Sequence, residues 1–80
     1  MDGKVLKIVN STFPIEEREL VLNELKKLTI DDVMAKSSKN LLNAHLAILK
    51  LSDGDASQIS HYTSCAKKDF RDVIYWASEE

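Results

Sequence analysis

The apolar residues of the chain recur mainly at the spacing of an α-helix. From Pro14 to Leu28 they gather on one side of a helix drawn at 100° per residue. Proline is favoured in the first turn of a helix, and here glutamates follow it while lysines precede the end, as the helix dipole prefers. The pattern predicts an amphipathic helix over residues 14–28. Its apolar face consists of Ile15, Val21, Leu22, Leu25 and Leu28.

A second helix is predicted over about residues 30–51. Thr29 and Asp32 have the spacing of a capping box at its start. The apolar residues of this segment spread over more than half of the helix circumference, which is typical of a helix packed on two sides. We therefore expect it to be the central helix of the domain. The stretch KSSKN at 36–40 contains two serines that favour a break, so one helix or two remain open.

The last third of the chain predicts one kinked helix or two separate ones. Gly54 suits the end of the central helix, and Asp55 suits the cap of the next. Apolar residues at positions 59, 62, 66, 70, 73 and 77 form one continuous stripe. However, Asp69 with Asp72 three residues later also fits the start of a new helix. The sequence does not decide whether the chain breaks at 67–69.

Residues 1–13 give the weakest pattern. The segment KVLKIV at 4–9 is β-branched enough for a strand, but no partner strand follows, and an isolated strand is unstable. We expect an extended or loosely helical arm. The predicted fold is therefore all-α: a single domain over residues 1–80, with an N-terminal extended or irregular arm at 1–13 and a bundle of three to four helices at 14–80.

Composition narrows the class of protein. Eighty residues make one small domain, which buries only about 60% of the surface that its unfolded chain exposes. The net charge of −2 argues against a general binder of nucleic acid or anionic membranes. The single cysteine, Cys65, excludes an internal disulfide. The first residues lack the apolar segment of a signal peptide, and no apolar run is long enough to span a membrane, so we expect a cytoplasmic protein.

Two histidines and the cysteine are the candidates for chemistry. His45 lies within the apolar arc of the central helix, where we interpret it as a hydrogen-bonded core residue; a ligand-binding or proton-transfer role is the alternative. His61 and Cys65 are four residues apart and face each other on a helix, the spacing of half a metal site or of a thiol–imidazole pair. No phosphate loop, paired carboxylates or nucleotide fingerprint accompanies them. We predict no enzyme activity, no cofactor and no metal.

Aromatic residues concentrate near the C-terminus. Phe70 continues the core stripe with Val73, but Tyr75 and Trp76 fall on opposite flanks of that stripe. Tyrosine, tryptophan and arginine are the residues that most often anchor protein interfaces. We therefore predict a partner-binding surface formed by residues that the core does not require. Its members are Arg71, Tyr75, Trp76 and the exposed Leu20.

The leading functional hypothesis is a non-enzymatic helical protein-interaction module, acting as an adaptor, regulator or antagonist. Its partner would be another protein or a second copy in a homodimer, because small cores are often completed by association. The alternative is a weak nucleic-acid-binding protein that uses lysine-rich helix faces, although the charge balance makes nucleic acid the less favoured partner. Those lysines are Lys36, Lys39, Lys50, Lys67 and Lys68.

Two stretches, LLNAHLAILKLSDGD and AKKDFRDVIYWA, resemble a group of short bacterial proteins of unknown function. The shared pattern is LAILKLS.G, a spacer, then AK.D(Y/F)RDV(I/L).WA, and it covers residues 41–77. The resemblance implies a bacterial, cytoplasmic, helical protein and carries no activity. The matching positions are Leu46, Ala47, Ile48, Leu49, Lys50, Leu51, Ser52, Gly54, Ala66, Lys67, Asp69, Phe70, Arg71, Asp72, Val73, Trp76 and Ala77.

Overall fold

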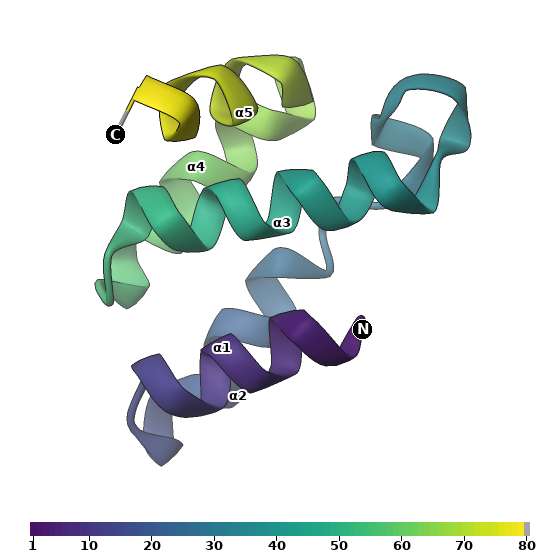
Figure 1. Cartoon of the computed structure of the whole chain (residues 1–80). Helices are drawn as coiled ribbons and strands as arrows, with labels where there is room; N and C mark the ends of the chain where they lie inside the picture. Colours follow the sequence, from purple (N-terminus) through teal and green to yellow (C-terminus); the bar gives the residue numbers. More distant parts are fainter. Residues whose placement is uncertain (80) are drawn as a thin grey trace.

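A computed structural model describes residues 1–79 as an all-helical domain (Figure 1). This confirms the predicted fold class, and no strand occurs within these residues. Two short 3₁₀ turns, Ile30–Asp32 and Met34–Lys36, connect the second α-helix to the third. The five α-helices are α1 (Gly3–Thr12), α2 (Ile15–Leu25), α3 (Ser38–Ser52), α4 (Ala56–Lys68) and α5 (Phe70–Glu79).

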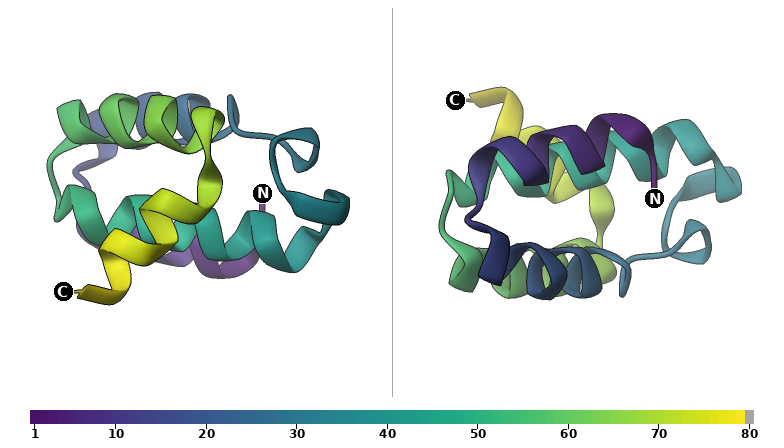
Figure 2. Two further views of the ribbon diagram at one scale, coloured as in Figure 1. Left: turned by 90° about the horizontal axis from the view of Figure 1, so that it is seen from above. Right: turned by 90° about the horizontal axis from the view of Figure 1, so that it is seen from below.

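The helices form two stacked hairpins with one further helix across them. Helices α1 and α2 make the first hairpin, α3 and α4 make the second, and α5 crosses the far side of the second (Figures 1 and 2). Helix α3 packs against α1, α4 and α5, and α2 packs against α4. The helix predicted over about residues 30–51 is therefore the central one, in the part that forms α3.

The expected extended or irregular N-terminal arm is wrong: residues 4–9 belong to α1, a regular helix. Val5, Val9 and Phe13 are spaced four residues apart, so they fall on one helix face, and all three are buried. Asp2 caps the helix by accepting a hydrogen bond from the Lys4 N–H at 2.8 Å. The segment gains its stability from packing on α2 and α3, which outweighs the β preference of its valines.

The central helix begins later than predicted, at Ser38. The Thr29–Asp32 capping box exists, with the Thr29 N–H donating to Asp32 Oδ2 at 2.8 Å, but it caps only a 3₁₀ turn. The chain then passes through left-handed backbone at Ala35 (φ 59°) and Lys36 (φ 49°), which ends any helix there. Ser37 caps α3, its Oγ accepting from the Asn40 N–H at 3.2 Å. The open question of one helix or two is thus answered by two short 3₁₀ turns followed by one α-helix.

The chain also breaks at Asp69, so the last third contains two helices. Asp69 has extended backbone (φ −158°), and its carboxylate Oδ1 accepts from the Arg71 N–H at 3.1 Å. This is N-cap geometry for α5. Together with α1, this break accounts for five helices where three to four were expected. No helix within residues 1–79 is both long and apolar enough to cross a membrane.

One buried polar group has no partner within residues 1–79: the hydroxyl of Thr63 in α4. Burying a hydroxyl without a hydrogen bond costs free energy, and valine has nearly the same shape. We expect Thr63→Val to raise the free energy of unfolding by about 1 kcal/mol, measured by urea denaturation. Thr63→Ser, which keeps the hydroxyl and removes a methyl group, should lower it. A Thr63→Val protein less stable than the parent would contradict this assignment.

Candidate functional site

An aromatic cluster joins the outer sides of α4 and α5. The rings of Tyr62 and Trp76 meet edge to face, with centroids 6.5 Å apart and planes at 63°. His61 packs on the other side of Tyr62, with centroids 4.9 Å apart. Such edge-to-face contacts stabilise aromatic pairs beyond the area that they bury. Trp76 remains 40% exposed, so it is only partly used by the fold.

Tyr75 and Arg71 are exposed on α5, the helix that also contains Trp76. They are four residues apart, so their side chains are neighbours on one helix face. Tyr75 is 62% exposed, the largest exposed fraction among the aromatic residues. We call these residues together the α4–α5 surface. Its members are His61, Tyr62, Arg71, Tyr75 and Trp76.

Arg71 is held in a fixed position by the residue that caps its own helix. Its Nε and Nη2 donate to the two carboxylate oxygens of Asp69, each at 2.9 Å. These hydrogen bonds from Arg71 hold the pKa of the Asp69 carboxyl below its usual value. The guanidinium nevertheless stays largely exposed. The planar Arg71 guanidinium is therefore held in one orientation on the surface of α5.

Leu20 does not join the other predicted contact residues. It is 56% exposed on α2, in the first hairpin, whereas α5 lies on the opposite side of the second hairpin (Figures 1 and 2). The structure thus places Arg71, Tyr75 and Trp76 on the same helix, α5, and Leu20 on a different one. Sequence reasoning also missed Tyr62, which was assigned to the core stripe with Ile59. It lies at the edge of that stripe, half-buried, where it reaches Trp76.

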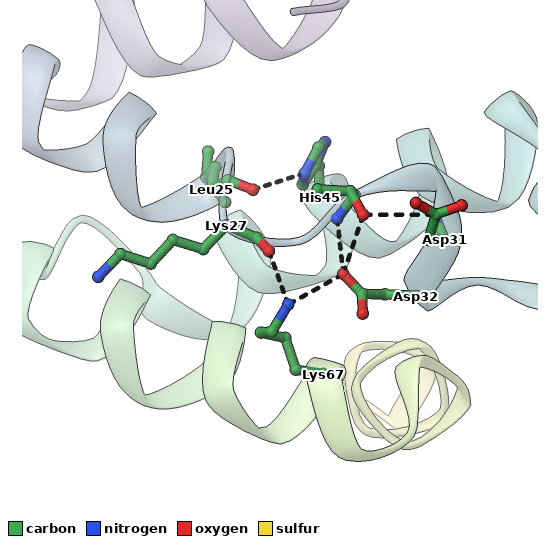
Figure 3. Close-up of polar contacts among 7 residues, drawn as sticks. Leu25, Lys27, Asp31, Asp32, His45 and Lys67 are labelled. Atoms are coloured by element: carbon green, nitrogen blue, oxygen red, sulfur yellow. Dashed lines mark hydrogen bonds and ion pairs between the residues drawn. The ribbon is translucent and has the colours of Figure 1, made fainter.

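Two of the candidate nucleic-acid-binding lysines are engaged in contacts within the protein. Lys67 donates to the backbone oxygen of Lys27 at 2.9 Å and to Asp32 Oδ2 at 3.1 Å, which ties α4 to the segment after α2 (Figure 3). The pKa of Asp32 is lowered, first by the hydrogen bond from the Thr29 backbone and further by Lys67. Lys36 pairs with Asp31 at 3.6 Å. Lys67 and Lys36 are thus each paired with an aspartate of the segment that joins α2 to α3.

His45 is buried and hydrogen-bonded, which agrees with its interpretation as a core residue. Its Nε2–H donates to the backbone oxygen of Leu25 at 2.9 Å and so links α3 to the end of α2 (Figure 3). Burial lowers the pKa of the imidazole below its usual value, because water no longer solvates the charged form. The neutral ring is therefore the form that the fold favours.

The predicted proximity of His61 and Cys65 is present on the outer side of α4. The Cys65 Sγ lies 3.9 Å from the His61 Nε2. Among residues 1–79, no three His, Cys, Asp or Glu side chains group in a way that could hold a metal ion. The contact therefore adds Cys65 to the side of the aromatic cluster where His61 lies.

Comparison with known protein families, curated proteins and solved structures finds no match for this chain. The surfaces described above are thus the basis for the function proposed below.

Proposed function

We propose that the protein is a non-enzymatic helical interaction module that binds another protein through the α4–α5 surface, acting as an adaptor, regulator or antagonist. The observation that carries the proposal is the exposure of two large aromatic residues, Tyr75 at 62% and Trp76 at 40%, on one helix. Burying such rings against a partner removes a large apolar area from water. In line with the bacterial resemblance of residues 41–77, we place this role in a bacterial cytoplasm.

The fixed positions of two side chains in the α4–α5 surface favour binding. Trp76 is fixed by Tyr62, and Arg71 is fixed by Asp69, so neither side chain needs to lose much conformational freedom when a partner docks. Rigid aromatic residues beside an arginine are the usual composition of interface hot spots. Because the Arg71–Asp69 pair carries no net charge, we expect the contact to depend on shape and apolar burial more than on long-range attraction.

Arg71→Ala combined with Tyr75→Ala is expected to remove binding without unfolding the protein. Both side chains are exposed, and surface substitutions of this kind usually change stability by less than about 0.5 kcal/mol each. Hot-spot residues contribute about 2 kcal/mol or more, so the dissociation constant should rise at least about 30-fold. The measurement is calorimetric titration of the purified partner, first captured with the tagged protein from its native host.

The matched control is Leu20→Ala, which truncates an exposed apolar side chain in the other hairpin and should leave this contact intact. Trp76→Ala should weaken both binding and stability, since it also removes the Tyr62 contact. If the Arg71/Tyr75 double variant binds the partner as tightly as the parent, the α4–α5 surface is not the contact site.

A further inference from the structure

Helices α1 and α3 differ in charge from helix α2. Helices α1 and α3 contain four lysines and no aspartate or glutamate, whereas α2 contains four glutamates and a single arginine, Arg18. That arginine is used locally, because its Nε donates to the backbone oxygen of Phe13 at 2.9 Å. Helices α1 and α3 lie side by side and run in the same direction, whereas α2 packs against α1 and α4 (Figures 1 and 2). The molecule therefore has one basic and one acidic helical face.

The basic face also contains a groove with apolar walls. A groove of about 470 Å³ follows the C-terminal halves of α1 and α3, with Ile8, Leu46 and Leu49 among its lining residues. A second depression of about 280 Å³ lies at the N-terminal ends of the same two helices, lined in part by Leu41 and Leu42. We call the two together the α1–α3 groove. Its apolar walls lie where two parallel helices meet, which is the kind of site that receives a further helix.

Lysines occur on both helices that form this groove. Lys50 lines it directly. Lys39 lies eleven residues earlier in the same helix, about three turns, and so on the same side of α3. Lys4 precedes Ile8 by one turn on α1. The carboxylates at the groove, Asp2 and Asp53, lie at its two ends, where Asp2 already caps α1.

The outward face of α2 has the complementary character. Ile15 and Leu20 are 76% and 56% exposed, respectively. Glu16 and Glu19 are exposed between them on the same side of the helix. A helix with two projecting aliphatic side chains and a pair of carboxylates matches an apolar groove bordered by lysines.

We propose that the acidic face of α2 docks into the α1–α3 groove of a second copy of this chain. The two surfaces point in different directions on one molecule, so the contact is head to tail rather than two-fold symmetric. In such a pair one copy retains a free groove and the other a free α2 face, so the assembly grows with concentration or closes into a ring. This contact uses none of the α4–α5 surface and is independent of the function proposed above.

Sedimentation velocity over a range of protein concentrations and two salt concentrations tests the proposal. The average mass of the parent protein's assemblies is expected to rise with protein concentration. This rise should be less steep at high salt, because salt screens the exposed charges. Lys39→Glu combined with Lys50→Glu should weaken association about tenfold or more, since two attractive pairs become repulsive. Lys68→Glu is the matched control for Lys50→Glu, because it makes the same change of charge at the end of α4. It should leave association unchanged.

A charge swap identifies the paired surfaces. Glu16→Lys combined with Glu19→Lys should also weaken association, because α2 and the groove are then both basic. Mixing this variant with the Lys39→Glu/Lys50→Glu variant should restore it, since each contact in the mixture joins opposite charges. Ile15→Ser combined with Leu20→Ser gives a second, charge-neutral variant at exposed positions, and it should also reduce association.

Two results would overturn the proposal: a parent protein that stays monomeric at every concentration, or association that survives these variants. Loss of association only in the Arg71→Ala/Tyr75→Ala protein would assign self-contact to the α4–α5 surface instead. If self-association is not found, the partner-binding proposal is unaffected, because it is tested with other variants and by calorimetric titration.

Discussion

Ile48→Ala is expected to lower the free energy of unfolding by about 2–5 kcal/mol, the largest effect of any single substitution considered for this protein. Ile48 is fully buried in α3, the helix that packs against α1, α4 and α5. Truncation removes buried apolar atoms and leaves a cavity between helices that cannot all close around it. A domain of this size has a total stability of about 4–12 kcal/mol. The variant should therefore lose a large fraction of the total stability.

Urea denaturation followed by circular dichroism measures this effect. Leu20→Ala is the matched control, because it removes an aliphatic side chain that is exposed and should cost less than about 0.5 kcal/mol. A loss below about 1 kcal/mol for Ile48→Ala would mean that the hairpins and α5 do not share a core centred on α3.

The central role of α3 was predictable because it depends on local information. An apolar arc that covers most of a helix requires partners on several sides, whichever helices these are. The start of α5 was predictable as one of two alternatives for a similar reason: the Asp69 cap acts within two residues. These features are properties of short segments, and the sequence contains them directly.

The conformation of residues 1–13 and the start of α3 were not predictable in the same way. Val5 and Val9 fit a strand by propensity and a helix by spacing, and only their burial against the neighbouring helices decides between the two. The turn before α3 relies on left-handed backbone at Ala35 and Lys36. Non-glycine residues in this conformation have no sequence signature, because the rest of the fold imposes it.

The candidate site was predicted in part. Wheel positions placed Tyr75 and Trp76 outside the core face of α5, and both are indeed among the exposed apolar residues. The contact between Trp76 and Tyr62 depends on how α4 and α5 cross, which no single helix pattern contains. Leu20 was grouped with them because a sequence indicates which side of a helix is exposed but not which hairpin it belongs to.

Acidification is expected to destabilise the protein through His45. The direction of this change in stability follows from the pKa of His45 in the folded and in the unfolded protein. In the folded protein, burial lowers the pKa of the imidazole below 6.5, whereas in the unfolded chain it binds a proton near that ordinary value. The nearby amino terminus acts in the same direction as burial. The contribution of His45 to stability is thus complete above about pH 6.5, and it is lost as the pH falls towards the folded-state pKa.

The aspartates with lowered pKa values do not contribute to the loss of stability in this pH range. Asp32, Asp55 and Asp69 have pKa values lowered from 3.8, so the stability that they add is lost only at more acidic pH. The experiment is urea denaturation at intervals between about pH 7 and pH 5, with His45→Gln as the comparison. Glutamine retains an N–H that can donate to the Leu25 oxygen but does not titrate, so its stability should be nearly constant over this range.

The His61→Gln variant tests whether the other histidine contributes to the loss of stability at acidic pH. Because His61 is exposed on α4, this variant should keep the same fall in stability as the parent. The comparison decides whether the hydrogen bond between α3 and the end of α2 is the acid-sensitive point of the fold. A His45→Gln protein that loses stability between pH 7 and pH 5 as steeply as the parent would show that another group is responsible.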